Sequence, residues 1–145
     1  MIISPARKYI FVHIPKTGGT SMALALEARA KRDDILIGDT PKALARRHRL
    51  RGLKCAGRLW KHSRIADIAG LAAAEPLDDF IVFTIVRDPW DRVLSLYQWL
   101  RSQTFAHISV ERATSLSFSD FLGDQQIATM LSHDPVRLYN RRDGP

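Results

Sequence analysis

Cysteine is scarce in this sequence: Cys55 is the only one among 145 residues. A single cysteine forms no intramolecular disulfide and cannot build a Cys-based zinc site alone. The sequence also lacks a run of about 18 apolar residues, the length of a membrane-spanning helix; its longest such stretch is Phe80–Val86. No small-residue cleavage site follows the first apolar residues, so no signal peptide is predicted. These absences favour a soluble, cytoplasmic protein.

Acidic residues are outnumbered by basic ones, 15 against 22, which gives a formal net charge of +7. Between Pro41 and Arg64 there is no acidic residue at all. Such a segment suits an anionic substrate or cofactor, a nucleic acid, or simply a solvated surface. Only Trp60 offers an aromatic stacking platform there, which disfavours nucleic acid. The nine basic residues of the segment are Lys42, Arg46, Arg47, Arg49, Arg51, Lys54, Arg58, Lys61 and Arg64.

The hydrophobic pattern predicts strands that alternate with helices. Strands are expected at Tyr9–Ile14, at Ile35–Ile37 and at Phe80–Val86, the last of them buried on both faces. This alternation predicts an α/β fold with a central parallel sheet, in one domain over residues 1–145, with ligands beyond the carboxyl ends of the strands. The expected helices cover residues 20–32, residues 41–52 behind a Thr40 cap, residues 63–76, a segment from Pro89 with its apolar stripe Val93, Leu96, Tyr97 and Leu100, and residues 117–131.

A glycine-containing loop, HIPKTGGTS at residues 13–21, joins the first of these strands to a helix. Glycines let backbone N–H groups converge on an anion, and the helix N-terminus adds partial positive charge. Lys16 adds a full charge, and Thr17, Thr20 and Ser21 add hydroxyl groups. The lysine precedes the glycines, unlike the lysine of a Walker A loop. The loop is predicted to bind a phosphate or a phosphosulfate.

A second candidate anion site follows Phe80–Val86, in the sequence RDPWDRVLS at residues 87–95. Asp88 is predicted to cap a helix in which Pro89 takes the first position. Arg87 and Ser95 could then bind one phosphate, the first through its guanidinium fork and the second through its hydroxyl. Arg92 is expected to be a surface residue, from which it could reach the same anion.

Taken together, the two segments resemble the sulfotransferases that use 3′-phosphoadenosine 5′-phosphosulfate (PAPS), in particular the carbohydrate type in a short, bacterial-type form. HIPKTGGTSM at residues 13–22 and VRDPWDRVLSLY at residues 86–97 match the two nucleotide-binding motifs of that family, in the family order. The resemblance implies a P-loop NTPase-like, three-layer α/β/α sandwich. It also implies that the 3′-phosphate is bound by Arg87 and Ser95, and the 5′-phosphosulfate by Lys16, Thr17, Gly18, Gly19, Thr20 and Ser21.

The activity implied by the resemblance is transfer of a sulfuryl group from PAPS to a hydroxyl of a saccharide or glycolipid, with release of adenosine 3′,5′-bisphosphate (PAP). No metal ion is implied. Lys16 would neutralise the leaving phosphate. Of the five histidines, His62 matches the position where many carbohydrate sulfotransferases place a histidine, and we predict it as the general base. The competing interpretation of His62 is a capping or packing role, and His13 is expected to be structural.

Family members generally continue beyond the second motif, so the resemblance implies a C-terminally truncated or short form. Two other classes of protein stay open. One is an ATP-type phosphotransferase, which the position of Lys16 disfavours. The other is a catalytically silent module that binds an anionic nucleotide or a nucleic acid through residues 42–64. The acceptor and the oligomeric state are not predicted.

Overall fold

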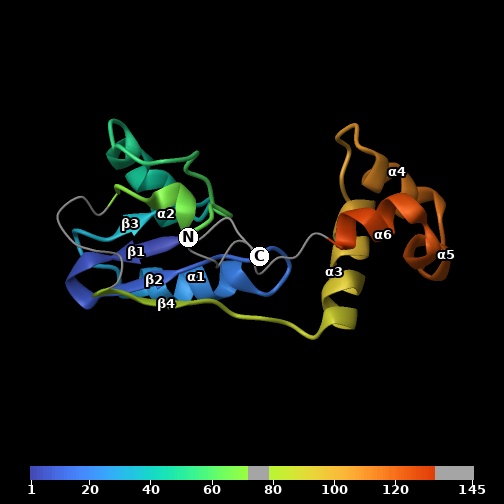
Figure 1. Ribbon diagram of the computed structural model, residues 1–145, viewed down its shortest axis with the longest axis horizontal. Coiled ribbons are helices and arrows are strands. Elements are labelled where there is room, and N and C mark those ends of the chain that lie inside the picture. The colour runs from blue at the N-terminus through green and yellow to red at the C-terminus, as the bar shows by residue number, and fades with distance from the viewer. Residues whose placement is uncertain (72–78, 133–145) are drawn as a thin grey trace. The chain divides into compact units, whose positions relative to one another are not determined.

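The computed structural model describes residues 1–71 and 79–132, which fall into two compact units (Figure 1). The N-terminal unit comprises the described residues up to Val86, and the C-terminal unit those from Arg87. The first carries the sheet and the second is helical. The elements of the N-terminal unit, with η for a 3₁₀ helix, are β1 (Ile2–Ser4), η1 (Pro5–Arg7), β2 (Tyr9–Phe11), α1 (Gly19–Ala28), β3 (Ile35–Leu36), α2 (Pro41–Arg46), η2 (Arg47–Leu50), η3 (Ala66–Ile68) and β4 (Ile81–Phe83).

The sheet is mixed, with strand order β3-β1-β2-β4. β2 and β4 are parallel neighbours, but β1 runs antiparallel to both β2 and β3. The prediction of an all-parallel sheet is therefore wrong. The cause is β1, a strand that the sequence analysis did not predict. From β1 the chain turns straight back through η1 and Lys8, whose φ of 54° is left-handed, and so short a connection can only join antiparallel strands.

Successive side chains of a strand point to opposite faces of the sheet. Both of these faces are covered by other parts of the unit. On one face Ile10 and Val12 share a core cluster with Ile65 and Ile68, around η3. On the other face Phe11 lies in a cluster with residues of α1 and α2. Within the described residues, α-helices therefore cover one face and a 3₁₀ turn with its flanking loops covers the other. This arrangement is α/β, and the sheet holds the loop after β2 in place.

Two predicted elements differ from the observed ones. Phe80–Val86 was expected to form a central strand, but β4 lies at the edge of the sheet, with Ile81 71% exposed and Val86 79% exposed. The predicted helix over residues 63–76 is wrong in its described part, which forms only the short η3 turn. One turn is enough to bury both Ile65 and Ile68, so the apolar spacing there does not require an α-helix. Residues 72–78 lie outside the described part.

The C-terminal unit consists of α3 (Pro89–Arg101), α4 (Ile108–Ser115), α5 (Phe118–Gly123) and α6 (Gln125–Leu131). The predicted Asp88 cap and Pro89 start of α3 are confirmed: the Asp88 carboxylate accepts hydrogen bonds from the N–H groups of Trp90 and Asp91, at 3.0 and 3.2 Å. The prediction of one helix over residues 117–131 is wrong, because Asp124 ends α5 and caps α6. α4, which the sequence analysis missed, is capped by the imidazole of His107.

The core of this unit confirms the predicted stripe of α3. Tyr97 and Leu100 are buried there, with Val93 and Leu96 packed against them. Over residues 1–71 and 79–132, every helix is too short or too polar to span a bilayer.

Candidate functional site

The loop between β2 and α1 has an unusual backbone conformation. Lys16 has a φ of 65° and Gly18 a φ of 87°, so both residues are left-handed. A lysine is rarely found in this region, and such conformations persist where the surrounding structure enforces them, often at functional sites. The Thr17 side chain is buried, and its hydroxyl donates to the Ile14 carbonyl at 2.9 Å. That bond fixes the turn and leaves the backbone N–H of Thr17, rather than its hydroxyl hydrogen, as the group that can donate to a ligand.

The first turn of α1 exposes backbone N–H groups that could bind an anion. Gly18 occupies the N-cap position and, having no side chain, cannot cap the helix. The N–H groups of Gly19, Thr20 and Ser21 therefore point out of the helix N-terminus, where the helix dipole favours negative charge. Thr20 and Ser21 are exposed, and Lys16 is half-buried beside the turn. These features are suited to binding an anion.

A close approach between His13 and Gly19 fixes where α1 begins. A Cβ at Gly19 would lie 2.1 Å from Cδ2 and 2.4 Å from Nε2 of the His13 imidazole, so no residue larger than glycine fits there without a shift. Burial, assisted by the neighbouring His62, lowers the pKa of His13 to about 4. His13 is therefore a neutral, buried ring that supports the turn, in agreement with the structural role expected from the sequence.

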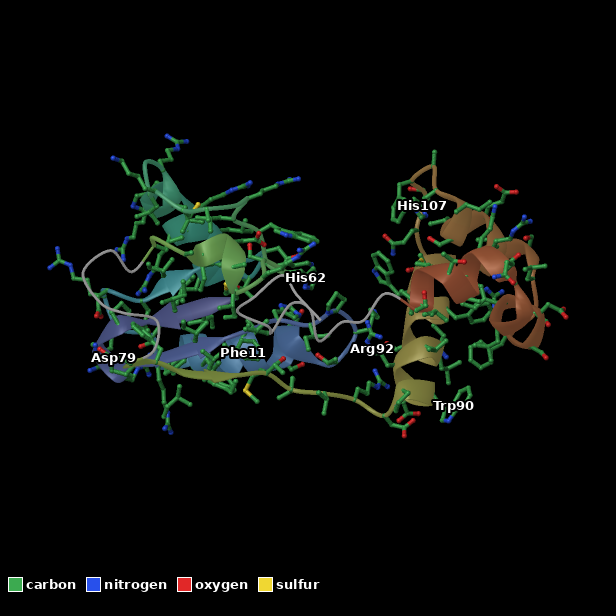
Figure 2. The ribbon with its side chains drawn as sticks, viewed as in Figure 1. Phe11, His62, Asp79, Trp90, Arg92 and His107 are labelled. Carbon is green, nitrogen blue, oxygen red and sulfur yellow. The ribbon has the colours of Figure 1, made fainter. Side chains whose placement is uncertain are left out.

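His62 lies in the same unit (Figure 2) and contacts His13. Its Nδ1 is 2.7 Å from the His13 carbonyl oxygen, and the two imidazole rings meet edge to face with centroids 4.7 Å apart. Trp60 packs on the ring from another side, with centroids 5.0 Å apart. Because a carbonyl oxygen can only accept, Nδ1 carries the proton and Nε2 is left with a lone pair. This is the tautomer that a general base requires.

Burial also sets the protonation of His62. It lowers the pKa of this imidazole below its ordinary value, and the hydrogen bond to the His13 carbonyl opposes this effect only in part. The ring is therefore mainly neutral at pH 7 and can accept a proton. This tautomer could not be predicted from the sequence, because the carbonyl that sets it lies 49 residues away along the chain.

The second motif is built differently from the first. Asp88 occupies the N-terminal N–H groups of α3 with its own carboxylate, so an anion there would be bound by side chains. Arg87 is exposed at the start of the unit, and Ser95 is half-buried on α3. Arg92 is half-buried three residues before Ser95, and burial lowers the pKa of its guanidinium. Residues three apart share one face of a helix, so Arg92 and Ser95 can serve the same ligand.

The predicted site residues thus fall into two groups. Lys16, Thr17, Gly18, Gly19, Thr20 and Ser21 lie with His62 in the N-terminal unit, and Arg87 and Ser95 lie in the C-terminal unit. His13, assigned before only a structural role, connects the first group, since its ring contacts Gly19 and its carbonyl holds His62. The described residues contain no group of three or more His, Cys, Asp or Glu side chains placed to hold a metal ion.

Comparison with known proteins adds a family. No curated protein and no solved structure is similar enough to match the chain. A family model described as the sulfotransferase family matches residues 1–141, which include both motifs and both units. This match covers nearly the whole sequence and agrees with the resemblance that the two motifs carry. The chain belongs to the sulfotransferase family.

Proposed function

We propose that this protein is a PAPS-dependent sulfotransferase that transfers the sulfuryl group to a hydroxyl of a saccharide or glycolipid. The observation that carries the proposal is the hydrogen bond between His62 and the His13 carbonyl. This hydrogen bond leaves the Nε2 lone pair of His62 able to accept a proton. His62 lies in the same unit as the loop that we propose to bind PAPS. Membership of the sulfotransferase family supports sulfuryl transfer in general, and the match of both motifs supports PAPS as the donor.

In this proposal the N-terminal turn binds the phosphosulfate. The N–H groups at the start of α1 and the Lys16 ammonium surround its oxygens, and the hydroxyls of Thr20 and Ser21 add donors. As the bond between sulfur and the bridging oxygen breaks, negative charge grows on the 5′-phosphate. Lys16 and the helix N-terminus stabilise that charge more in the transition state than in the ground state, which is what accelerates a group transfer.

His62 activates the acceptor. The acceptor hydroxyl oxygen attacks sulfur, a new S–O bond forms, and the old S–O bond to the phosphate breaks to release PAP. The hydroxyl proton passes to Nε2 of His62 as the attack proceeds. The hydrogen bond from Nδ1–H to the His13 carbonyl stabilises the imidazolium that results. Bulk solvent then removes this proton.

The same proposal assigns the chain to one domain of the three-layer, P-loop NTPase-like kind, with Arg87 and Ser95 on the 3′-phosphate. The family model, which covers both motifs, supports this assignment. The cytoplasm as the compartment stays a prediction.

Calorimetry with PAP and with ATP, on the same preparation, tests the donor. We expect PAP to bind and ATP to bind at least tenfold more weakly (about 1.4 kcal/mol), because the turn lacks the lysine position of a Walker A loop. Binding of ATP without binding of PAP would contradict the proposal and favour a phosphotransferase. Release of PAP from PAPS only in the presence of a saccharide or glycolipid hydroxyl would establish transfer.

A further inference from the structure

The tryptophan beside the proposed base is only partly buried. Trp60 is 48% exposed, although tryptophan is highly buried on average. Its ring meets the His62 imidazole edge to face, with the ring planes at 86° and the centroids 5.0 Å apart. Aromatic pairs prefer this arrangement over a face-to-face sandwich. Trp60 therefore covers part of His62 and remains partly exposed itself.

A tight turn fixes the backbone that carries both rings. The Ser63 N–H donates to the Trp60 carbonyl at 3.0 Å, which closes a four-residue turn with His62 at its third position. The Ser63 hydroxyl is fully buried and accepts the Trp60 N–H at 2.8 Å. The middle of the turn is bound as well, since the Met1 amino group donates to the Lys61 carbonyl at 3.0 Å. These bonds fix the spacing of Trp60 and His62 along the turn.

The orientation of the His62 ring depends on contacts of the ring itself. Its Nδ1–H donates to the His13 carbonyl at 2.7 Å, and the rings of His13 and Trp60 pack against it. The terminal torsion of a histidine side chain is broad and roughly two-fold. Half a revolution about this torsion would exchange Nδ1 with Cδ2 and break the hydrogen bond. Trp60, which is fixed in the same turn, packs where it opposes this rotation.

We infer that Trp60 is a positioning residue for the base: its ring keeps the His62 imidazole in the orientation in which Nδ1–H faces the His13 carbonyl. This inference rests on the proposed function, in which Nε2 of His62 accepts the proton. Without the indole, the imidazole would turn and bond to water through either nitrogen. A ring that carries its proton on Nε2 has no lone pair there and cannot act as the base. Trp60 thereby favours the competent tautomer.

The indole also keeps water from the imidazole. Burial is the largest cause of the lowered pKa of His62, and the hydrogen bond to the His13 carbonyl opposes it. Within the described residues, the ionisable groups that act on this ring are the Lys61 ammonium and the Met1 amino group, which lower the pKa, the Asp39 carboxylate, which raises it, and the neutral His13 imidazole. A substitution of Trp60 alters none of these groups. A change in the pKa of His62 in such a variant therefore reports the burial that the indole provides.

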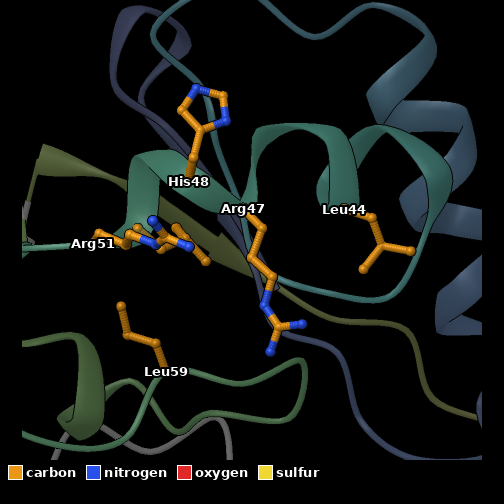
Figure 3. Close-up of a pocket in the computed structure, with 6 residues that line it drawn as sticks. Leu44, Arg47, His48, Arg51 and Leu59 are labelled. Carbon is orange, nitrogen blue, oxygen red and sulfur yellow. The ribbon is translucent and has the colours of Figure 1, made fainter.

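Nitrogen-15 NMR of the histidine rings tests this inference in the full chain, without donor or acceptor. Trp60→Ala removes the ring, Trp60→Leu keeps an apolar side chain that fills part of the space, and Trp60→Phe keeps an aromatic ring. Trp99→Ala is the matched control, because Trp99 is another partly exposed tryptophan (41%) and lies in the C-terminal unit. His48 is the reference signal. It is exposed, and Figure 3 shows its ring pointing away from Leu59, the residue before Trp60.

We expect the proton on Nδ1 of His62 in the wild type, in Trp99→Ala and in Trp60→Phe, with a pKa below 6.5. In Trp60→Ala and Trp60→Leu the Nε2–H tautomer should appear, and the pKa of His62 should rise toward 6.5. Unchanged His48 signals show that a variant is folded. If His62 keeps its tautomer and pKa in both Trp60→Ala and Trp60→Leu, the inference is wrong. It is also wrong if Trp60→Phe changes them as much as Trp60→Ala does, since an aromatic ring would then not be what holds the imidazole.

PAP calorimetry and turnover separate this result from the proposed function. Trp60→Ala should bind PAP as the wild type does, and its kcat for PAP release from PAPS should fall about two- to tenfold, the range of one aromatic pair. If the tautomer changes and kcat does not, Trp60 holds the ring but His62 is not the base. If PAP fails to bind while the tautomer depends on Trp60, the donor assignment is wrong and the hold of Trp60 on His62 stands.

Discussion

At the scale of single residues, the tightest constraint on the site is the contact between Gly19 and His13. In Gly19→Ala the new Cβ would overlap the imidazole, so either the ring or the first turn of α1 must move. We expect a loss of about 1–3 kcal/mol of stability, the usual cost of overpacking, together with loss of PAP binding. Gly123→Ala is the control, because a Cβ there meets no atom within 4 Å. Thermal unfolding and PAP calorimetry measure both effects, and a normal PAP affinity in Gly19→Ala would contradict this account of the turn.

His62 is the second residue whose role can be isolated. We expect His62→Ala to lower kcat by about 10²- to 10⁴-fold, the contribution typical of a general base, and to leave PAP affinity unchanged.

In the wild type the neutral imidazole of His62 is the form expected to be active. Because burial lowers the pKa of His62 below 6.5, activity should persist as the pH falls through 6.5 and be lost only below it. Transfer at the wild-type rate in His62→Ala would rule out the assignment, and an acid limb above pH 6.5 would contradict the effect of burial. His48→Ala, at an exposed histidine, is the control.

At the scale of elements, helix starts were the most predictable feature, because a cap is local. Thr40 and Asp88 were each predicted as caps, and the side chain of each accepts a backbone N–H at the start of its helix. Strand direction was not predictable in the same way. The turn that reverses the chain after β1 depends on a left-handed Lys8, and lysine gives no signal for that conformation. The tautomer of His62 also depends on the fold, because the His13 carbonyl that sets it is distant in sequence.

The Thr40 cap does more than start α2. Its hydroxyl also contacts both carboxylate oxygens of the buried Glu27, at 2.7 Å each. Thr40→Ala should therefore remove a cap, worth about 1 kcal/mol, and leave a buried carboxylate without this donor, which costs about 1–3 kcal/mol more. Ser117→Ala removes an exposed cap and an exposed hydrogen bond to the Asp120 carboxylate, and should cost only about 1 kcal/mol. Urea unfolding measures the free energy of unfolding of both variants. Thr40→Ser keeps the hydroxyl and should retain most of the stability that Thr40→Ala loses. Equal losses in the two alanine variants would show that Glu27 does not depend on Thr40.

At the scale of the whole molecule, the family match spans two units that each hold one of the motifs. The sequence predicted the two motifs and their order through the resemblance. The sequence could not predict that the boundary between the compact units falls at Arg87, because the second motif begins at Val86 and continues past that point. The contribution of each motif to nucleotide binding can be measured separately.

PAP and AMP distinguish those contributions, since AMP lacks the 3′-phosphate. Lys16→Ala should weaken the binding of both nucleotides, because in the proposed binding mode the turn holds the 5′-phosphate, and it should lower turnover more than binding. Arg87→Ala should weaken PAP binding by about 10- to 100-fold, the value of a hydrogen bond to a charged group, and leave AMP binding unchanged. Arg101→Ala controls for charge on α3, since that guanidinium lies over the Tyr97 ring, 5.5 Å from its centroid. If Arg87→Ala weakens PAP and AMP equally, Arg87 does not bind the 3′-phosphate, because only a contact with that group can depend on its presence.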